Sequence, residues 1–347
     1  MLYELLIFII LFIEGILLTN FLYKRSHKIG LKKNITNLPR WSSQTKPILG
    51  GVVFFFVVLS GFIITNFWLD KNFLLYKFNS ILFFSITLSF IMGLADDLLN
   101  TSPYFKFVVQ FIIAIVFIYS GFYIKFFDNT YLNYILTIFW VVGIINSVNM
   151  LDNMDAVATS TIFIISAALV FISFVLEKFD LAIIMFLTLP SLLAFLFFNW
   201  PPSKMYMGDN GSQMLGTLIA GVGIIFVWNA GVENNLLHID IVLSVGLMFL
   251  LLLTDTTTVT VNRLLKGKSP FKGDKNHTTH CLVKRGFSEK QVAIIFITIT
   301  LFSSAIAATI ITGYIKLNII YRIILSVFLI SVFLLLYINS KLKSNEN

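Results

Sequence analysis

Long apolar runs recur along the whole chain, and they limit the folds that it can adopt. Many are close to 20 residues, the length of a helix that crosses the hydrocarbon core of a bilayer. Only 12% of the 347 residues are charged, about half the usual share of a soluble domain. None of the runs shows the alternating polarity of a membrane β-strand. We therefore expect an all-α polytopic membrane protein with about eleven transmembrane helices.

The whole chain, 1–347, is expected to form a single membrane domain, because no stretch has the composition of a linker or a soluble domain. The expected spans lie near 2–22, 48–68, 80–97, 107–124, 131–149, 157–176, 180–198, 212–230, 238–258, 291–312 and 318–339.

The basic residues predict the orientation of these spans. With alternating loops, 19 of the 25 Lys and Arg residues fall on one side of the membrane and six on the other. Cytoplasmic loops are enriched in Lys and Arg, so the N-terminus is expected outside and the C-terminus in the cytoplasm. The net charge of +8 is then a topology signal and a contact for anionic lipid, and we expect no nucleic-acid partner.

The chemically unusual residues fall in the expected cytoplasmic loops. These loops lie near 23–47, 96–106, 146–157, 199–213 and 259–290. A single cysteine, Cys281, excludes an internal disulfide and a cysteine-only zinc site.

The segment "GLADDLLNTSPYFKFVVQ" (93–110) places Asp96 and Asp97 side by side at the end of an apolar run. Each would cost about 2.5–3.5 kcal/mol at the bilayer centre. Adjacent like charges need a cation, and either a divalent metal or Lys106 could supply it. Lys106 and Gln110 are four residues apart and share one helix face. A solvated loop with a snorkelling lysine is the alternative.

The segment "NSVNMLDNMDAVATS" (146–160) repeats a polar residue at every third position. The four residues are Asn146, Asn149, Asp152 and Asp155. On a helix or 3₁₀ turn they would form one polar stripe between two apolar spans. Helix capping explains one such residue, but not four in register.

The segment "WPPSKMYMGDNGSQMLG" (200–216) places Asp209 between Gly208 and Gly211, just before a span. Glycine-rich turns at helix N-termini favour bound anions. A carboxylate there can hold a metal that bridges phosphate oxygens. An ordinary Asp-Asn-Gly turn capped by Ser212 would have the same sequence.

The fourth segment (253–288) contains Asp255, Arg263 and a basic loop with His277 and His280. Zinc is not expected, because no helix carries a Glu between the histidines and the loop is full of cations. Lysines, an arginine and two imidazoles instead suggest a site for a diphosphate. Membrane topology alone would explain the lysines but not the histidines.

Carboxylates, a glycine turn and a cationic histidine loop on one membrane face are the groups needed for magnesium-dependent phosphoryl transfer at the inner leaflet. A transporter is the competing hypothesis, because intramembrane carboxylates also mark ion pathways. Transporter sites, however, lie near the midplane. A catalytically inactive homologue is a further alternative.

The order of these segments resembles the polyprenyl-phosphate N-acetylhexosamine-1-phosphate transferases, over roughly residues 45–290. "KPILGG", "GLADD", "NSVNMLDNMDAVA", "KMYMGDNGSQMLG" and "SPFKGDKNHTTHCLVKRGFS" are similar to that family's motifs. Eleven spans suit its branch that uses simple UDP-N-acetylsugars. Asn153 and Ala156 stand where the family usually has glycine. The loop has "HTTH" in place of the triple-His form of the peptidoglycan enzyme.

The resemblance implies a reaction and a set of site residues. A sugar 1-phosphate, with N-acetylglucosamine 1-phosphate preferred over other N-acetylhexosamines, would pass from a UDP-sugar to undecaprenyl phosphate, releasing UMP. The implied catalytic residues are Asp96, Asp97 and Asp209. Mg²⁺, with Mn²⁺ as an alternative, would bind Asp209 with Asp96 or Asp97. The implied substrate-binding residues are Lys106, Asn146, Asn149, Asp152, Asp155, Gly208, Arg263, His277 and His280. The implied location is the bacterial inner membrane with the site on its cytoplasmic face, and the implied assembly is a homodimer.

Overall fold

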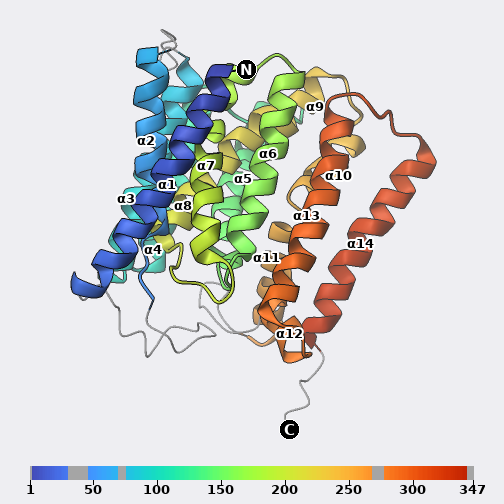
Figure 1. Ribbon diagram of the computed structural model, residues 1–347. Coiled ribbons are helices and arrows are strands. Elements are labelled where there is room, and N and C mark those ends of the chain that lie inside the picture. Colours follow the sequence, from blue (N-terminus) through green and yellow to red (C-terminus); the bar gives the residue numbers. More distant parts are fainter. Residues whose placement is uncertain (1, 30–45, 69–75, 268–276, 342–347) are drawn as a thin grey trace.

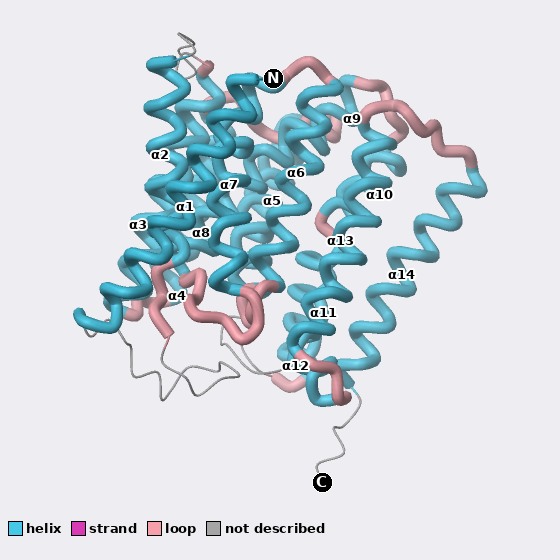
Figure 2. Tube along the Cα trace, viewed as in Figure 1, coloured by secondary structure: helices cyan, strands magenta, loops and turns pink. Residues whose placement is uncertain are grey.

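The computed structural model of the chain describes residues 2–29, 46–68, 76–267 and 277–341. In these ranges the protein is a bundle of helices, drawn in Figures 1 and 2, and the only β-type pairing is an isolated bridge between Ile48 and Tyr206. The predicted all-α multi-pass membrane fold is confirmed.

The helices follow the apolar runs of the sequence. Those of the first half are α1 (Leu2–Ile29), α2 (Gly50–Trp68), α3 (Lys77–Leu99), α4 (Pro103–Tyr119), α5 (Thr130–Leu151) and α6 (Val157–Val175). Those of the second half are η2 (Phe179–Ala182), α7 (Ile183–Asn199), α8 (Asp209–Gly223), η3 (Ile224–Asn229), α9 (Ala230–Glu233), α10 (His238–Met248), α11 (Leu250–Leu265), α12 (Thr278–Lys284), α13 (Glu289–Ile311) and α14 (Ile319–Lys341).

The predicted count of eleven spans is too high by the criteria of length and composition. Within the described residues, nine spans are long and apolar enough, or ten if α10 and α11, bent by 82°, form one broken span. The remaining predicted span, 107–124, is the shorter apolar helix α4. It ends because Gly121 has φ +87° and donates its N–H to Ile118 while Phe122 donates to Phe117, the Schellman arrangement.

Helix α8 forms the centre of the bundle. It packs against α2, α3, α5, α6 and α7. In the apolar span Asp209–Glu233, which begins with α8, 89% of the most apolar stretch is buried. The corresponding share for the peripheral α14 is 11%. A helix that is apolar all round is stable only when neighbours surround it or lipid does, and here the neighbours surround α8.

One end of the bundle gathers the segments that the sequence predicts to be functional. We call it the site end. It contains the end of α3, the end of α5, the start of α8 and the short helix α12 (Figure 1). Helix α1 begins at the opposite end and α14 finishes at the site end (Figure 1).

Candidate active site

Asp209 is the first residue of α8, and the carboxylate of Asp97 fixes its position. The backbone N–H of Asp209 donates to Oδ1 of Asp97 at 3.2 Å, and the N–H of Asn210 donates to Oδ2 at 3.0 Å. The first N–H groups of a helix lack partners inside the helix and carry partial positive charge, so an anionic acceptor is favourable there. Asp97 therefore joins the predicted aspartate pair to the predicted glycine turn.

Glycines let these backbones approach closely. Gly208 has φ +82°, a conformation that favours glycine. A Cβ at Gly208 would lie 2.4 Å from Cγ2 of Ile48 and 2.9 Å from Oδ2 of Asp97. A Cβ at Gly93 of α3 would lie 2.3 Å from the carbonyl oxygen of Asp209. The contact between α3 and α8 thus depends on missing side chains.

Lys106 lies between two carboxylates. Its Nζ is 2.6 Å from Oδ2 of Asp96 and 2.5 Å from Oδ2 of Asp209. Thr101 also donates to Oδ1 of Asp96, at 2.6 Å. Ser102 caps α4 by accepting from the N–H of Phe105, so Lys106 falls in the first turn of the helix. The structure therefore brings together three predicted residues from three different helices.

Buried polar side chains join α4, α5 and α8 close to this group. Gln110, one turn after Lys106, donates to Oε1 of Gln213 at 3.0 Å. The side chain of Asn146 donates to Oε1 of Gln110 at 2.8 Å. Gln110 and Gln213 are both buried. The first residue of the predicted polar stripe is thus hydrogen-bonded to Gln110, which lies one turn after Lys106 on α4.

The rest of the polar stripe divides between a helix and a turn. Asn146 and Asn149 lie in the last turns of α5, which ends at Leu151. Asp152 is the C-cap residue of α5, and Asp155 lies in the turn before α6. Asn149, Asp152 and Asp155 are all partly buried. The predicted helical stripe is therefore helical over its first half only.

Asp155 has a cationic partner far away in the sequence. Nζ of Lys46 lies 3.4 Å from Oδ2 of Asp155 and donates to Oγ of Ser203 at 3.0 Å. The N–H of Ser203 donates to the same oxygen of Asp155 at 3.0 Å. Lys46 is buried, and its ammonium lies 5.1 Å from the ring centre of Tyr206. These contacts hold the turn of the stripe against the loop that leads to α8.

The segment after Lys46 lies alongside the loop that precedes Gly208. Tyr206 donates its N–H to the carbonyl of Pro47 at 2.9 Å, and Gly50 donates to the carbonyl of Tyr206 at 3.1 Å. A Cβ at Gly51 would lie 2.2 Å from the backbone nitrogen of Gly211. The "KPILGG" element therefore also supports the Asp209 turn.

The two histidines begin the short helix α12. Nδ1 of His277 lies 2.9 Å from Oδ2 of Asp255, and the rings of His277 and His280 are 6.1 Å apart, edge to face. Thr279 donates to Oδ1 of Asn153, in the turn after α5. The histidines are thus joined to the turn that contains Asp152 and Asp155.

Arg263 lies two turns after Asp255 on α11 and is buried, with 5% of its surface exposed. Residues 268–276 of the predicted histidine loop and residues 30–45 of the predicted loop 23–47 lie outside the described residues.

The sequence segments that form this site are similar to those of known proteins. The model of glycosyl transferase family 4 matches residues 79–227. This part of the chain is therefore similar to glycosyl transferase family 4. It contains Asp96, Lys106, the polar stripe and Asp209.

Longer matches extend beyond residues 79–227. The chain is 25% identical to a probable undecaprenyl-phosphate N-acetylglucosaminyl 1-phosphate transferase of Bacillus subtilis, over 92% of this chain and 88% of the relative. It is 28% identical to phospho-N-acetylmuramoyl-pentapeptide-transferases of Listeria welshimeri, over 76% and 84%, and of a Wolbachia species, over 86% and 96%. The resemblance drawn from the motifs is confirmed.

Three contacts around the site involve residues that the sequence analysis did not place among the site residues. Gln213 had a local signal, because it follows Asp209 by four residues and shares its helix face. Lys46 begins the "KPILGG" motif, but nothing in the sequence indicated its pairing with Asp155, from which 109 residues separate it. Asp255 stood out as a carboxylate near a helix end, but nothing in its neighbours indicated His277.

The carboxylates of Asp96 and Asp209 suit a magnesium ion. Both point an oxygen at one ammonium group, so both lie within reach of a single small cation. No group of three or more His, Cys, Asp or Glu residues suited to a metal occurs in the described parts of the chain. Mg²⁺ needs no such cage, because it is commonly held by one or two carboxylates together with substrate phosphates and water.

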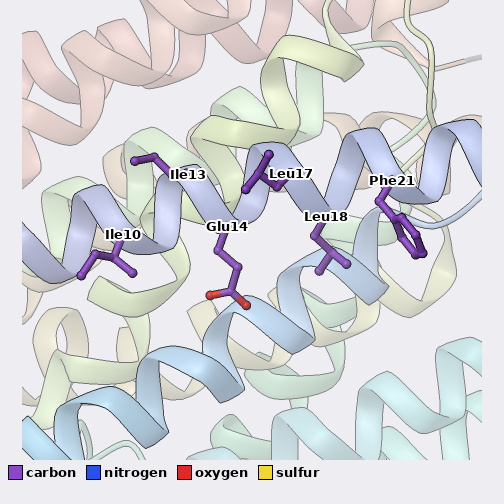
Figure 3. Close-up of a pocket in the computed structure, with 6 residues that line it drawn as sticks. All are labelled: Ile10, Ile13, Glu14, Leu17, Leu18 and Phe21. Carbon is purple, nitrogen blue, oxygen red and sulfur yellow. The ribbon is translucent and has the colours of Figure 1, made fainter.

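A groove on α1 is separate from this site. It has a volume of about 470 Å³ and is lined by Ile10, Ile13, Glu14, Leu17, Leu18 and Phe21. Glu14 points toward α2 in Figure 3 and accepts a hydrogen bond from Ser60 at 2.7 Å. The hydrogen bond between α1 and α2 accounts for this carboxylate as a structural contact.

Proposed function

We propose that the protein transfers a sugar 1-phosphate from a UDP-N-acetylhexosamine to undecaprenyl phosphate and releases UMP. Lys106 between Asp96 and Asp209 at the start of α8 is the observation that carries the proposal, because it joins two carboxylates and a cation at one bundle end. The names of the relatives supply the substrate classes. The N-acetylglucosamine donor is preferred, since the Bacillus subtilis relative aligns with 92% of the chain.

The reaction joins two anions. An oxygen of the lipid phosphate attacks the β-phosphorus of the UDP-sugar, and the bond from that phosphorus to the oxygen bridging to the α-phosphate breaks. UMP leaves with the bridging oxygen, and the product is a polyprenyl diphosphosugar. Because a phosphate monoester is already largely ionised near neutral pH, the larger task is to offset charge repulsion.

The residues of the site divide this task. Mg²⁺, or Mn²⁺ in its place, would be held by Asp209 and Asp96 and would supply positive charge to the phosphate oxygens. Asp97 would hold Asp209 through the backbone of α8. Lys106 would contact a phosphate, and Asn149, Asp152 and Asp155 would line the pocket for the nucleotide sugar. His277, His280 and Arg263 would contact the diphosphate or the sugar.

The same proposal includes a location. The site end would face the cytoplasm of a bacterium, in its inner membrane, where a soluble UDP-sugar can reach a phosphate whose prenyl tail stays in lipid. The N-terminus would lie outside and the chain would act as one membrane domain. A homodimer is part of the proposal by resemblance only.

Release of UMP from the purified protein in detergent tests this function. The assay contains undecaprenyl phosphate, Mg²⁺ and one UDP-N-acetylsugar at a time, including the N-acetylglucosamine and N-acetylmuramoyl-pentapeptide donors. We expect UMP from one donor only when both lipid and Mg²⁺ are present. The Asp209→Asn variant should lose turnover by at least about 100-fold, because charge stabilisation at the reacting phosphate is lost.

Two results would contradict the proposal. Folded wild-type protein that releases no UMP from any donor would remove the transferase function. Normal turnover by a folded Asp209→Asn variant would remove Asp209 from the metal site. Uptake of an ion or solute into vesicles containing the protein, without UMP release, would favour a transporter instead.

A further inference from the structure

Asp255 is a buried carboxylate whose hydrogen bonds all lead to the start of the histidine helix. Its Oδ1 accepts from the N–H of Thr278 at 2.9 Å and from the Oγ1 hydroxyl of Thr278 at 2.6 Å. Its Oδ2 lies 2.9 Å from Nδ1 of His277. The residue is 1% exposed. A carboxylate this deeply buried is costly unless it is paired, and these contacts pair it.

The contacts of Thr278 decide which oxygen faces the histidine. An ionised carboxylate only accepts hydrogen bonds, so the ring nitrogen at 2.9 Å must carry the hydrogen. His277 is then held with its proton on Nδ1, and Nε2 is the ring nitrogen left to act on a ligand. In the protonated ring the same carboxylate would stabilise the positive charge.

We infer that Asp255 is a positioning residue that fixes the tautomer and orientation of His277 for the anionic substrates of the proposed reaction. Asp255 touches no substrate in this scheme and acts through the imidazole. The inference rests on the proposed function for the identity of the ligand, but the geometry of the pair stands without it.

A second contact fixes the same helix from the other side. Thr279 donates to Asn153, in the turn that also contains Asp152 and Asp155. The start of α12 is therefore held between α11 and the turn after α5. This arrangement sets the distance from His277 to the residues proposed to bind the nucleotide sugar, so a small rotation of His277 should impair binding or turnover.

The Asp255→Asn variant tests the role of the carboxylate with almost no change in size. The amide oxygen can still accept from Thr278, which turns the amide NH₂ toward Nδ1 of His277. Two donors cannot face each other, so the histidine must move its proton to Nε2 or rotate. We expect UMP release to fall about 10- to 100-fold, the loss typical when the partner that orients a functional histidine is removed.

Two matched variants separate positioning from general damage. Asp240 is also a buried carboxylate, but it pairs with Arg322 at the opposite end of the bundle, at 2.7 Å and 3.0 Å. Asp240→Asn should change UMP release by less than about threefold. Thr278→Val removes one hydrogen bond to Oδ1 of Asp255 but leaves His277 paired, so we expect a loss smaller than that of Asp255→Asn.

Nitrogen-15 NMR of labelled histidine reads the tautomer directly and requires no activity. The chain has only four histidines, and a His277→Gln variant identifies the signal. We expect wild-type His277 to show a proton on Nδ1 that Asp255→Asn displaces, while Asp240→Asn leaves it in place. A wild-type His277 protonated on Nε2 alone would overturn the inference, whether or not the variants fold.

Turnover supplies the second criterion. Asp255→Asn that displaces the Nδ1 proton but keeps wild-type kcat and KM would also overturn the inference. If the wild type itself releases no UMP, the proposed function fails, and the NMR result still decides whether Asp255 sets the tautomer.

Discussion

Lys106 shows how one side chain can hold two like charges together. Its ammonium contacts Asp96 and Asp209 at the same time, and the three side chains retain only 14–21% of their exposure. At such partial burial, two carboxylates without a cation would repel each other strongly. A divalent ion would satisfy the same two oxygens, so Lys106 and such an ion would compete for part of one site.

The Lys106→Met variant should therefore depend more on metal than the wild type. Without the ammonium, only a divalent ion can neutralise Asp96 and Asp209. We expect Mg²⁺ to raise the thermal unfolding temperature of the variant more than that of the wild type, in the absence of substrate. Turnover should fall about 100-fold, because the phosphate loses a cationic contact. Differential scanning fluorimetry with and without EDTA measures the first effect.

The double variant with Lys106→Met and Asp209→Asn is the control for this prediction. It removes one of the two carboxylates, so its response to Mg²⁺ should fall below that of Lys106→Met alone. Equal responses in the wild type and in Lys106→Met would show that Lys106 does not share the site with the metal.

Ala156 shows what a single sequence can and cannot indicate at one position. The family resemblance marks it as a departure from glycine, which favours a different local turn. The structure instead keeps φ +65° at this alanine. Asn199 accepts hydrogen bonds from the N–H of Ala156 and from Oγ1 of Thr159, which supports the unusual backbone. A residue other than glycine is destabilised by about 1–2 kcal/mol in this left-handed conformation. The hydrogen bonds to Asn199 of α7 offset this, and the sequence alone does not reveal them.

At the scale of elements, the start of α8 is a junction of three helices. Asp97 of α3 accepts hydrogen bonds from it, and the segment that begins α2 pairs with the loop before it. Gly208 lies where these elements meet. Added atoms at this position would push against both Ile48 and Asp97.

The Gly208→Ala variant should lose stability and activity together. The methyl group meets the positive φ and also the close contacts at 2.4 Å and 2.9 Å. Gly121→Ala is the matched control, since Gly121 also has a positive φ but no atom within 4 Å of a Cβ. We expect about 1–2 kcal/mol for Gly121→Ala and at least about 3 kcal/mol for Gly208→Ala. Chemical unfolding monitored by tryptophan fluorescence measures both, and equal losses would contradict the crowding argument.

Element length and type were predictable from the apolar runs, whereas breaks in the elements were not. The 82° bend between α10 and α11 lies inside a run with no proline, so composition gives no sign of it. That bend leads into the helix that carries Asp255 to the site end. The carboxylates of the site were predictable because a charged residue at the end of an apolar span is costly and usually has a function. Their partners Lys46 and His277 belong to distant segments, and only packing decides such pairs.

At the scale of the whole molecule, the described helices place the start of α1 and the end of α14 at opposite ends of the bundle (Figure 1). The described parts of the expected cytoplasmic loops lie at the site end. The excess of Lys and Arg on this side predicts that it faces the cytoplasm, because translocation of basic loops is disfavoured. The proposed reaction makes the same demand, since its nucleotide sugar would come from the cytoplasm.

Labelling of single cysteines tests this orientation. Cys281 is buried, and a Cys281→Ala background allows one new cysteine at a time. Asp128, between α4 and α5, and Lys284, at the end of α12, are both exposed and lie at opposite ends. In cells whose inner membrane is intact and whose outer layers let the reagent through, a membrane-impermeant maleimide should label Asp128→Cys at once. Lys284→Cys should react only after the membrane is opened.

Labelling of Lys284→Cys, but not of Asp128→Cys, in intact cells would contradict both the orientation and the proposed donor. If Lys284→Cys were labelled from outside, Asp96, Lys106 and Asp209 would face a compartment without UDP-sugars, and the proposed donor would be untenable even though the carboxylates could still bind metal. Labelling of both positions in intact cells would point to leaky cells, and a cytoplasmic marker protein controls for this. The topology experiment therefore tests the substrate assignment without requiring any turnover.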